Sequence, residues 1–280
     1  MVATLPADLL AQVQGALRED IGAGDISANL IPVTLPAHAR VLCREAAVLC
    51  GASWFDQTFR QLDPGIQIHW HFPEGASVQA NSIVCELSGP ARVLLTGERT
   101  ALNFLQLLSA TATLTRRYVE AIAGTPCKIL DTRKTIPGLR TAQKYAVCCG
   151  GGTNHRIGLY DMVLLKENHI AAAGSIRAAL EAARAHAGRG RIEIEAENLD
   201  ELRQALDARA DIVLLDNFEL ALMRAAVALN RAHPHPALLE SSGGVTLAGL
   251  RAIAETGVDY ISVGALTKNV TAIDLSMRFD

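Results

Sequence analysis

Residues 191–216 read RIEIEAENLDELRQALDARADIVLLD, and this stretch decides the fold. It contains a short apolar strand at 192–196, an amphipathic helix at 199–209 and a second apolar strand at 211–215. Two buried strands joined by a helix are typical of a parallel βα unit, because parallel strands need a long crossover connection. The stretch therefore indicates an α/β domain built on a parallel sheet.

The same alternation continues on both sides of that stretch. Helices are expected at 175–188 and 247–257, and further apolar strands at 127–131, 162–166, 237–241 and 260–264. This makes six strands, two fewer than a complete barrel of this type contains. We therefore expect an incomplete (β/α) barrel with about six to seven parallel strands as the domain over 111–270.

The first part of the chain has a different pattern of predicted helices and strands. An amphipathic helix is expected within residues 1–20, and a long helix at 97–124 links two domains. Pro and Gly turn signals separate three further segments that are expected to be strands, at 39–51, 66–72 and 82–95. The prediction is an N-terminal α/β sandwich domain over 1–110, to which residues 271–280 return.

The composition excludes several classes of protein. The 280 residues are 50% hydrophobic and 20% charged, which favours an ordered globular protein over a disordered one. The net charge of -3 gives no general attraction to nucleic acid or to anionic membranes. No apolar run approaches the ~18 residues of a membrane span. The six cysteines include no C-x-x-C pair, so we expect reduced thiols and a cytoplasmic protein.

Polar residues stand where the predicted parallel strands end. They are Asp131, Lys166, Glu195, Asp216 and Glu240, and Gly264 ends the last of these strands. In βα barrels this rim is where active sites are built. Glu193 and Glu195 are two residues apart and therefore share one face of a strand. Such an acid pair is costly unless it is paired, bound to a metal or open to solvent.

Cations gather at 131–170, and two glycine-rich stretches lie in this region or in its continuation. Residues 131–170 contain six Lys and Arg against three acids, a local excess of three in a chain of net charge -3. The glycine-rich stretches CCGGGTNHR (148–156) and ESSGGV (240–245) suit phosphate or carboxylate, because their backbone N–H groups are not shielded by Cβ atoms. Acids beside such loops favour Mg²⁺. The pattern predicts a cationic pocket with acids across it.

Each of these residues also has a purely structural interpretation. Lys166 could extend to solvent at the end of its strand, and Glu195 and Asp216 could each cap the following helix. His155 could be a neutral structural histidine. The remaining alternatives are a plain turn for residues 241–244 and adjacent core thiols for Cys148 and Cys149.

Seven motifs extend the pattern over nearly the whole chain. In chain order they are REDIGAGDIS (18–27), GERTALNFLQLLSATAT (97–113), DTRKTIPGLR (131–140), QKYAVCCGGGTNHRIGLYDMVLLKENHI (143–170), IEIEAEN (192–198), LLDNF (214–218) and ESSGGV (240–245). As an ordered set they resemble the quinolinate phosphoribosyltransferases, also called nicotinate-nucleotide pyrophosphorylases (carboxylating). A single piece, such as the triple glycine, would be weak evidence.

The resemblance implies an enzyme, a glycosyltransferase of the pentosyltransferase kind. Such enzymes join quinolinate to phosphoribosyl pyrophosphate and release pyrophosphate and CO₂, giving nicotinate mononucleotide for de novo NAD biosynthesis. The resemblance also implies a Mg²⁺ cofactor and a homodimer or higher homo-oligomer with shared active sites. The alternatives are a related phosphoribosyltransferase acting on nicotinate or another acid, a molybdenum-utilisation homologue, and a catalytically silent binding protein.

Residue roles follow from the same resemblance. It implies that the carboxylates of quinolinate are bound by Arg133, His155, Arg156 and Lys166, together with Arg99 of a neighbouring subunit. Lys134 would hold the diphosphate, and Glu195 and Asp216 would bind the ribose hydroxyls and Mg²⁺, directly or through water. These three are the implied catalytic residues. Backbone donors to the 5'-phosphate would come from Ser242, Gly243, Gly244 and Gly264.

Two positions depart from the family pattern. Glu167 stands where the family commonly has Asp, which changes the reach of the side chain beside Lys166 by one methylene. Ala110 stands where Gly commonly follows Ser109, which adds a methyl group to a predicted helix. Neither departure removes a charged side chain that is expected to bind a substrate.

Overall fold

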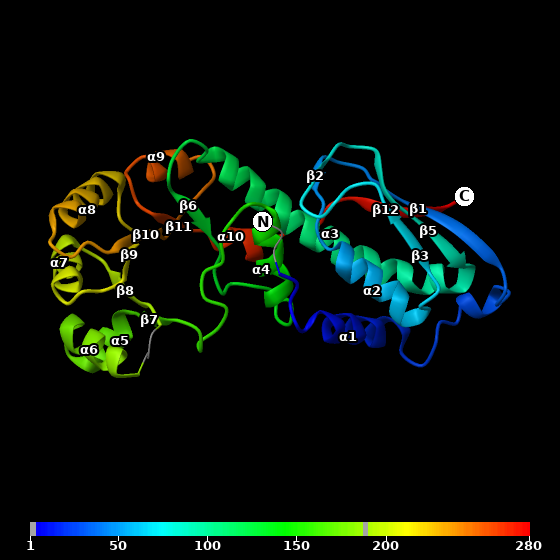
Figure 1. Cartoon of the computed structure of the whole chain (residues 1–280), viewed down its shortest axis with the longest axis horizontal. Helices are drawn as coiled ribbons and strands as arrows, with labels where there is room; N and C mark the ends of the chain where they lie inside the picture. Colours follow the sequence, from blue (N-terminus) through cyan, green and yellow to red (C-terminus); the bar gives the residue numbers. More distant parts are fainter. Residues whose placement is uncertain (1–3, 187–189) are drawn as a thin grey trace. The chain divides into compact units, whose positions relative to one another are not determined.

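The computed structural model describes residues 4–186 and 190–280, which form two compact units (Figure 1). The first unit runs to Arg116 and also includes Thr135–Gly151 and Ala265–Asp280. The second unit contains Arg117–Lys134 and Gly152–Gly264. Residues 1–3 of the expected first helix, and 187–188 of the helix expected at 175–188, lie outside the described residues.

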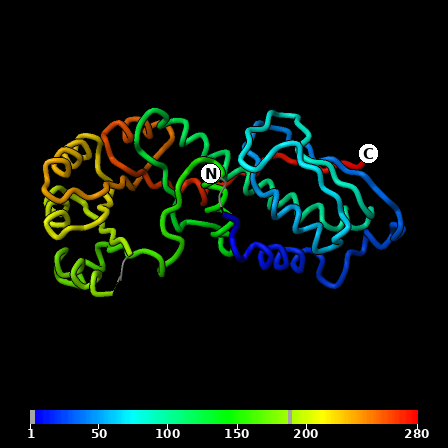
Figure 2. The backbone as a smooth tube through the Cα atoms, viewed as in Figure 1, coloured from blue at the N-terminus to red at the C-terminus, as the bar shows by residue number. Residues whose placement is uncertain are grey.

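The first unit is built on an antiparallel sheet of four strands. Their order is β12 (Leu275–Phe279), β1 (Pro36–Cys43), β5 (Ser82–Pro90) and β3 (Gln67–Trp70). The short strands β2 (Ala47–Val48) and β4 (Ser77–Val78) pair separately. Figure 2 shows the C-terminal segment, in red, lying among the strands of this unit, where β12 pairs with β1.

Helices bury one layer of apolar side chains against this sheet. The main ones are α2 (Ala52–Leu62) and α3 (Ala91–Ala121), whose Phe59 and Leu102 share a core with Val41 of β1. The unit also contains α1 (Leu9–Ile21), η1 (Ala28–Leu30), α4 (Arg140–Cys149) and α10 (Ala265–Lys268). On α1, Leu9, Val13 and Leu17 are buried, whereas Leu10, expected on the same face, is 53% exposed.

The long helix begins earlier than the sequence suggested. Residues 91–95, expected as the end of a strand, form the first turn of α3. Pro90 is the last residue of β5, and a proline has no N–H to continue the ladder. The strand therefore ends at Pro90, and the helix starts directly after it.

The second unit is an open parallel sheet of six strands, which confirms the predicted incomplete barrel. The order is β6 (Lys128–Leu130), β11 (Tyr260–Ser262), β10 (Leu238–Ser242), β9 (Ile212–Asp216), β8 (Ile192–Ala196) and β7 (Val163–Leu165). Figure 1 shows the helices of this unit outside the strands. They are α5 (Glu167–Ala173), α6 (Ile176–His186), α7 (Leu199–Asp207), α8 (Leu220–Ala232) and α9 (Leu250–Ala254).

Residues other than Glu195 and Asp216 occupy the N-cap positions of the crossover helices α7 and α8. Asn198 is the N-cap of α7, and its side chain accepts a hydrogen bond from the N–H of Glu201. Glu219 occupies the N-cap position of α8. The alternative in which Glu195 and Asp216 cap these helices is therefore wrong. In the described part of the chain, no helix is long and apolar enough to cross a membrane.

Candidate active site

A cavity of about 770 Å³ lies at the carboxyl ends of the parallel strands in the second unit. Nine of the predicted site residues line it: Arg133, Lys134, His155, Arg156, Lys166, Glu195, Asp216, Ser242 and Gly243. Gly244 and Gly264 belong to the same unit but do not line the cavity. Arg99 lies on α3 in the first unit, where its side chain is exposed. The rim of the sheet thus gathers most of the expected cations and acids.

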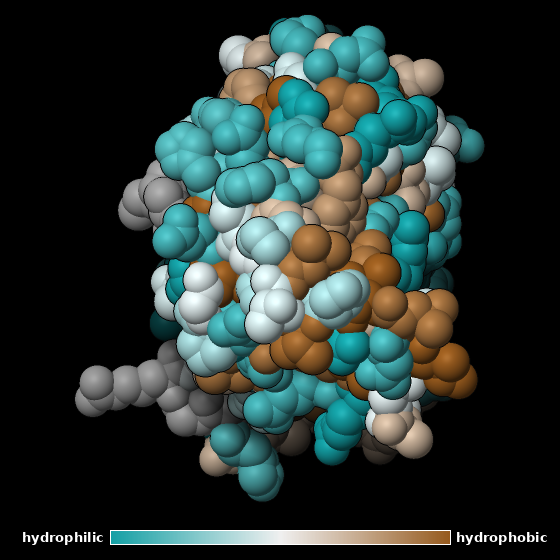
Figure 3. Space-filling view, turned by 90° about the vertical axis from the view of Figure 1, so that its right-hand side faces the viewer, coloured by the Kyte–Doolittle hydropathy of each residue, from teal (hydrophilic) through white to brown (hydrophobic). Residues whose placement is uncertain are grey.

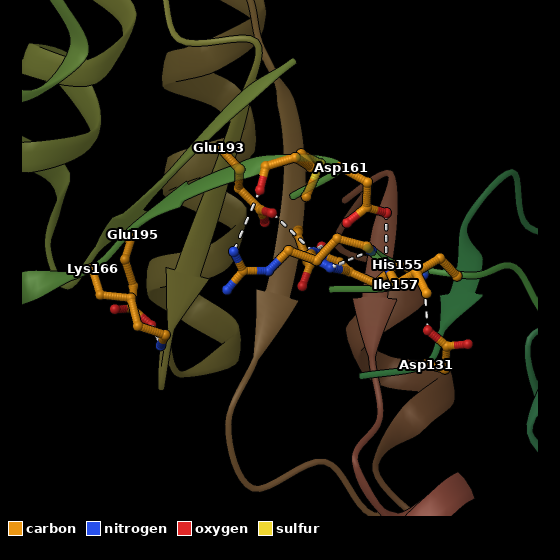
Figure 4. A network of polar contacts seen from close by, with 10 residues as sticks. Asp131, His155, Ile157, Asp161, Lys166, Glu193 and Glu195 are labelled. Atoms are coloured by element: carbon orange, nitrogen blue, oxygen red, sulfur yellow. Dashed lines mark hydrogen bonds and ion pairs between the residues drawn. The ribbon is translucent and has the colours of Figure 1, made fainter. Parts of the chain in front are cut away.

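Lys166 has an acidic partner. It directly follows β7, and its Nζ lies 2.9 Å from Oε1 of Glu195 on the neighbouring strand β8 (Figure 4). The Lys166 side chain is 46% exposed, but Glu195 is buried. Burial raises the pKa of Glu195, and the hydrogen bond from Lys166 opposes that shift. Lys166 therefore does more than extend to solvent.

The other acid on this face of β8, Glu193, binds His155. The Nε2 atom of His155 lies 2.8 Å from Oε2 of Glu193 (Figure 4). It also lies 3.4 Å from Oε2 of Glu240. Burial disfavours the charged imidazole, but the hydrogen bonds and charges of both glutamates outweigh it and raise the pKa of His155 to about 10. Burial raises the pKa of Glu193 to about 7. Two buried acids therefore hold His155 as a cation.

The segment that carries His155 is fixed beside β6. Thr153 forms an isolated parallel bridge with Leu130. Asp131, directly after β6, accepts hydrogen bonds from the backbone N–H of His155 at 2.9 Å and from Nδ2 of Asn154 at 2.6 Å. These bonds explain why the motif TNHR presents its histidine toward the rim of the sheet.

Two arginines that line the cavity have hydrogen-bond donors available for a ligand. Nε of Arg133 is buried and has no hydrogen-bond partner among the described residues. Burial and the nearby charge of Arg133 lower the pKa of Arg156. Two guanidinium groups this close, one with an unsatisfied buried donor, favour a carboxylate ligand, because a carboxylate supplies acceptors and cancels charge.

Close approaches of the backbone account for two of the predicted glycines. Gly243 has a φ of 98°, and a Cβ atom there would lie 2.1 Å from Oδ1 of Asn217. At Gly264, a Cβ atom would lie 3.0 Å from Cδ of Lys134. Gly244, with a φ of 57°, faces open space. The SSGG segment is thus a constrained turn in which only glycine fits at position 243.

The acids Glu195 and Asp216 fit a Mg²⁺ ion. They occupy adjacent strands and line the same cavity. They are close enough that the charge of Asp216 contributes to the raised pKa of Glu195, after the larger effect of burial. Carboxylate oxygens are the ligands that Mg²⁺ prefers in proteins, with water completing the shell.

Sequence reasoning gave no role to several residues of this site. Glu193 and Glu240 were recognised only as acids of the rim, and their contact with His155 joins residues 38 and 85 positions apart in the sequence. Asn217 lines the cavity with a φ of 55°, and its place directly after Asp216 in LLDNF was the available signal. Of the two departures, Glu167 lines the cavity and Ala110 is buried in the first unit.

Comparisons with known proteins agree with this geometry. The family models for the N-terminal and C-terminal domains of quinolinate phosphoribosyl transferase match residues 25–109 and 111–278. The chain is 43% identical over 260 residues to the probable nicotinate-nucleotide pyrophosphorylase [carboxylating] of Bacillus subtilis, covering 92% of this chain and 89% of that protein. It is 40% identical over 272 residues to the nicotinate-nucleotide pyrophosphorylase [carboxylating] of Mycobacterium leprae, covering 95% of each.

A solved structure gives the same result in three dimensions. The nicotinate-nucleotide pyrophosphorylase of Francisella tularensis superposes with a TM-score of 0.95 at 47% identity, covering 100% of this chain and 99% of that one. Both domain matches, the curated relatives and this structure agree over almost the full length. The chain belongs to the quinolinate phosphoribosyltransferase family.

Proposed function

We propose that this chain transfers the phosphoribosyl group of phosphoribosyl pyrophosphate to quinolinate, releasing pyrophosphate and CO₂ and giving nicotinate mononucleotide in de novo NAD biosynthesis. Family membership supports the reaction. The observation that supports this reaction most directly is that one cavity is lined by Arg133, Arg156 and Lys166 and also by Glu195 and Asp216. A cationic side suits a dicarboxylate, and an acidic side suits a ribose and its metal.

Quinolinate binds to the cationic side in this proposal. Planar guanidinium groups match carboxylates with two parallel hydrogen bonds. Arg133 and Arg156 supply such groups, and the buried Nε of Arg133, which has no hydrogen-bond partner among residues 4–186 and 190–280, supports a ligand at this position. Lys166 and His155 complete the set, His155 being held as a cation by Glu193 and Glu240. In this proposal the two carboxylates hold the pyridine ring in place.

Phosphoribosyl pyrophosphate binds to the opposite side. Ser242 ends β10 beside Asp216, and with Gly243, Gly244 and Gly264 it offers backbone N–H groups to the 5'-phosphate. Lys134 holds the diphosphate, and Glu195 and Asp216 take the ribose hydroxyls. Mg²⁺, when bound at these two acids, supplies positive charge that stabilises the leaving pyrophosphate.

The chemical step follows from this placement. The ring nitrogen of quinolinate bonds to the anomeric carbon as the bond from that carbon to the pyrophosphate oxygen breaks. Positive charge develops on the ribose, as in glycoside cleavage, and in this proposal the carboxylates of Glu195 and Asp216 stabilise it. The residues act by positioning and by electrostatics, and none is needed as a covalent nucleophile.

Decarboxylation completes the reaction. Ribosylation makes the ring a pyridinium, which stabilises negative charge on the adjacent carbon. The bond to the neighbouring carboxylate then breaks, CO₂ leaves, its electron pair stays on the ring carbon, and that carbon takes up a proton. Arg133 and Arg156 hold the carboxylates in place until this happens.

A homodimer or larger homo-oligomer with shared active sites is part of the proposal. Arg99 would bind quinolinate in the site of a neighbouring subunit, which suits its exposed position on α3. Figure 3 shows apolar side chains gathered on one face of the first unit. The large exposed hydrophobic residues of this unit include Ile26, Leu30 and Val33. Such a surface favours association with another protein chain.

The proposal also includes the domain division and the location. The proposed domains are 1–110 with 271–280, and 111–270. The boundary near residue 110 is supported by the family matches at 25–109 and 111–278, and the return of the C-terminal segment by the pairing of β12 with β1. The compact units differ from this division chiefly in that residues 135–151 belong to the first unit. A cytoplasmic location is supported by the six cysteines, all of which are free thiols. A magnesium requirement is supported by the carboxylate oxygens of Glu195 and Asp216.

An assay with two acceptors tests the proposed function. Purified protein is incubated with phosphoribosyl pyrophosphate, Mg²⁺ and either quinolinate or nicotinate, and nicotinate mononucleotide is followed by chromatography. We expect product from quinolinate alone. Product from nicotinate alone would assign the chain to the related transferase, and ligand binding without pyrophosphate release would indicate a silent binding protein.

A further inference from the structure

A second cluster of potential metal ligands lies in the first unit. One ligand atom from each of Cys50, Glu74 and Cys149 lies within 4.8 Å of the other two. The proposed reaction uses none of these residues. We propose that Cys50, Glu74 and Cys149 form a binding site for a thiophilic divalent cation, of which zinc is the natural candidate.

The two cysteines are held by their backbone. Cys50 lies between β2 and α2, where its N–H donates to Oγ of Ser109 and its carbonyl accepts from the same hydroxyl, both at 3.0 Å. Cys149 is the last residue of α4, and its carbonyl accepts a hydrogen bond from Arg116 at 3.3 Å. Residues 99 positions apart in the sequence are thereby fixed next to each other before any ion binds.

Glu74 is oriented by the start of α2. Its Oε1 accepts the N–H of Gly51 at 2.7 Å, and its Oε2 accepts the N–H of Ala52 at 3.2 Å. A carboxylate oxygen has a second lone pair, so these bonds orient the group without using up its capacity as a ligand. Carboxylates that bind metals are usually hydrogen-bonded in this way.

The charges of the cluster favour a dication. Within the described residues, no ion pair neutralises Glu74, and the nearby Arg116 donates to the carbonyl oxygens of Gly75, Cys149 and Gly150. A divalent cation would neutralise the carboxylate of Glu74 and displace the protons of the two thiols on binding.

The geometry requires only small adjustments. Zinc binds thiolates at about 2.3 Å and carboxylates at about 2.0–2.2 Å, which sets tetrahedral ligands roughly 3.3–3.8 Å apart. The three ligand atoms lie within 4.8 Å of one another, and rotation of their side chains would bring them to these shorter distances. Cys50 is buried, but Cys149 and Glu74 are partly exposed, so an ion can enter from their side and keep a water in the fourth position.

Cadmium absorption tests the proposal. The full-length protein, free of reductant and kept from oxygen, is titrated with Cd²⁺ in excess Mg²⁺, and the ultraviolet charge-transfer absorption of cadmium bound to thiolates is recorded. Carboxylates give no such absorption, so Cd²⁺ at Glu195 or Asp216 is silent. We expect one equivalent of Cd²⁺, a rise in the thermal midpoint, and about tenfold or greater weakening in Cys149→Ser and Cys50→Ser.

Matched variants decide the outcome. Cys148→Ser removes the neighbouring, equally part-exposed thiol and should keep the full absorption. Glu74→Gln should weaken binding but keep both thiolates. If Cys50→Ser fails to fold, judged by near-ultraviolet circular dichroism, the partly exposed positions 149 and 74 decide alone. Unchanged absorption in Cys149→Ser, no absorption in the wild type, or a thiol count of four that rises to six on reduction would overturn the proposal.

Discussion

The ammonium of Lys166 and the carboxylate of Glu195 bind each other at 2.9 Å, across neighbouring strands of the second unit. The proposed function gives these two groups to different substrates, Lys166 to quinolinate and Glu195 to the ribose and Mg²⁺. In the free protein they satisfy one another. Glu195 is buried, so this pairing removes the cost of an isolated carboxylate until the substrates arrive.

Replacing Lys166 by methionine should weaken quinolinate binding. A hydrogen bond to a charged group contributes about 1.5–3 kcal/mol, so the KM for quinolinate should rise roughly 10- to 100-fold. Initial rates at varied quinolinate and saturating phosphoribosyl pyrophosphate measure this. Lys128→Met, at the exposed start of β6, is the matched control. An unchanged KM in Lys166→Met would remove Lys166 from the quinolinate site.

Arg133 should not be replaceable by lysine. Its buried Nε and planar fork suit a carboxylate in a way that the single ammonium of lysine does not. We expect kcat/KM for quinolinate to fall on the order of 100-fold in Arg133→Ala, with little recovery in Arg133→Lys. Steady-state kinetics of both variants measure the difference. Full activity of Arg133→Lys would mean that charge alone is needed at this position.

Gly243 and Gly244 should differ in their tolerance of alanine. A Cβ atom at position 243 would lie 2.1 Å from Oδ1 of Asn217, whereas at position 244 it meets open space. Both have positive φ, so Gly244→Ala costs about 1–2 kcal/mol for the left-handed conformation alone. Gly243→Ala should cost more and also raise the KM for phosphoribosyl pyrophosphate. Urea unfolding and kinetics compare the variants, and equal effects would contradict the close approach.

The stability of the protein should fall with rising pH through the titration of His155. Its folded pKa of about 10 lies above its ordinary value of 6.5, so the folded state keeps a proton that the unfolded state releases between these values. The stabilisation is complete below about pH 6.5 and is lost as the pH approaches 10. Urea unfolding of wild type and His155→Gln between about pH 7 and 10 should converge, and a constant difference would refute this.

Subunit mixing tests whether active sites are shared. Arg99→Ala and Lys166→Ala proteins should each be weakly active. A mixed dimer restores one complete site, because Arg99 and Lys166 of that site come from different chains in this proposal. Activity should therefore reappear on mixing, up to about a quarter of the wild-type value for random exchange. No recovery, with exchange shown by mass-tagged subunits, would place both residues in one chain's site.

Periodicity and motif spacing predicted the parts of the fold that local physics controls. The stretch 191–216 contains β8, α7 and β9 because apolar strands and an amphipathic crossover helix have distinct periods. The rim position of Lys166 and Glu195 followed from the same pattern. The predicted start of α3 was wrong. The strand pattern continues past Pro90 in the sequence, but the residues that follow form a helix whose buried side chains share a core with Phe59.

Contacts between distant residues were out of reach of such reasoning. His155 meets Glu193 and Glu240 only because three separate segments reach one rim. The sequence pattern showed that the acid pair Glu193 and Glu195 needed partners, but not which cation would pair with which acid. The same limit applies to Cys50 and Cys149, whose proximity depends on the folding of the first unit.

The most direct test of the central claim is the stoichiometry of the two released products. Quinolinate labelled in the carboxylate next to the ring nitrogen is incubated with phosphoribosyl pyrophosphate and Mg²⁺, and labelled CO₂ and pyrophosphate are measured in the same reaction. The proposed function predicts one CO₂ for each pyrophosphate, and neither when a substrate is omitted. Pyrophosphate without CO₂, or no release of either from the complete mixture, would contradict it.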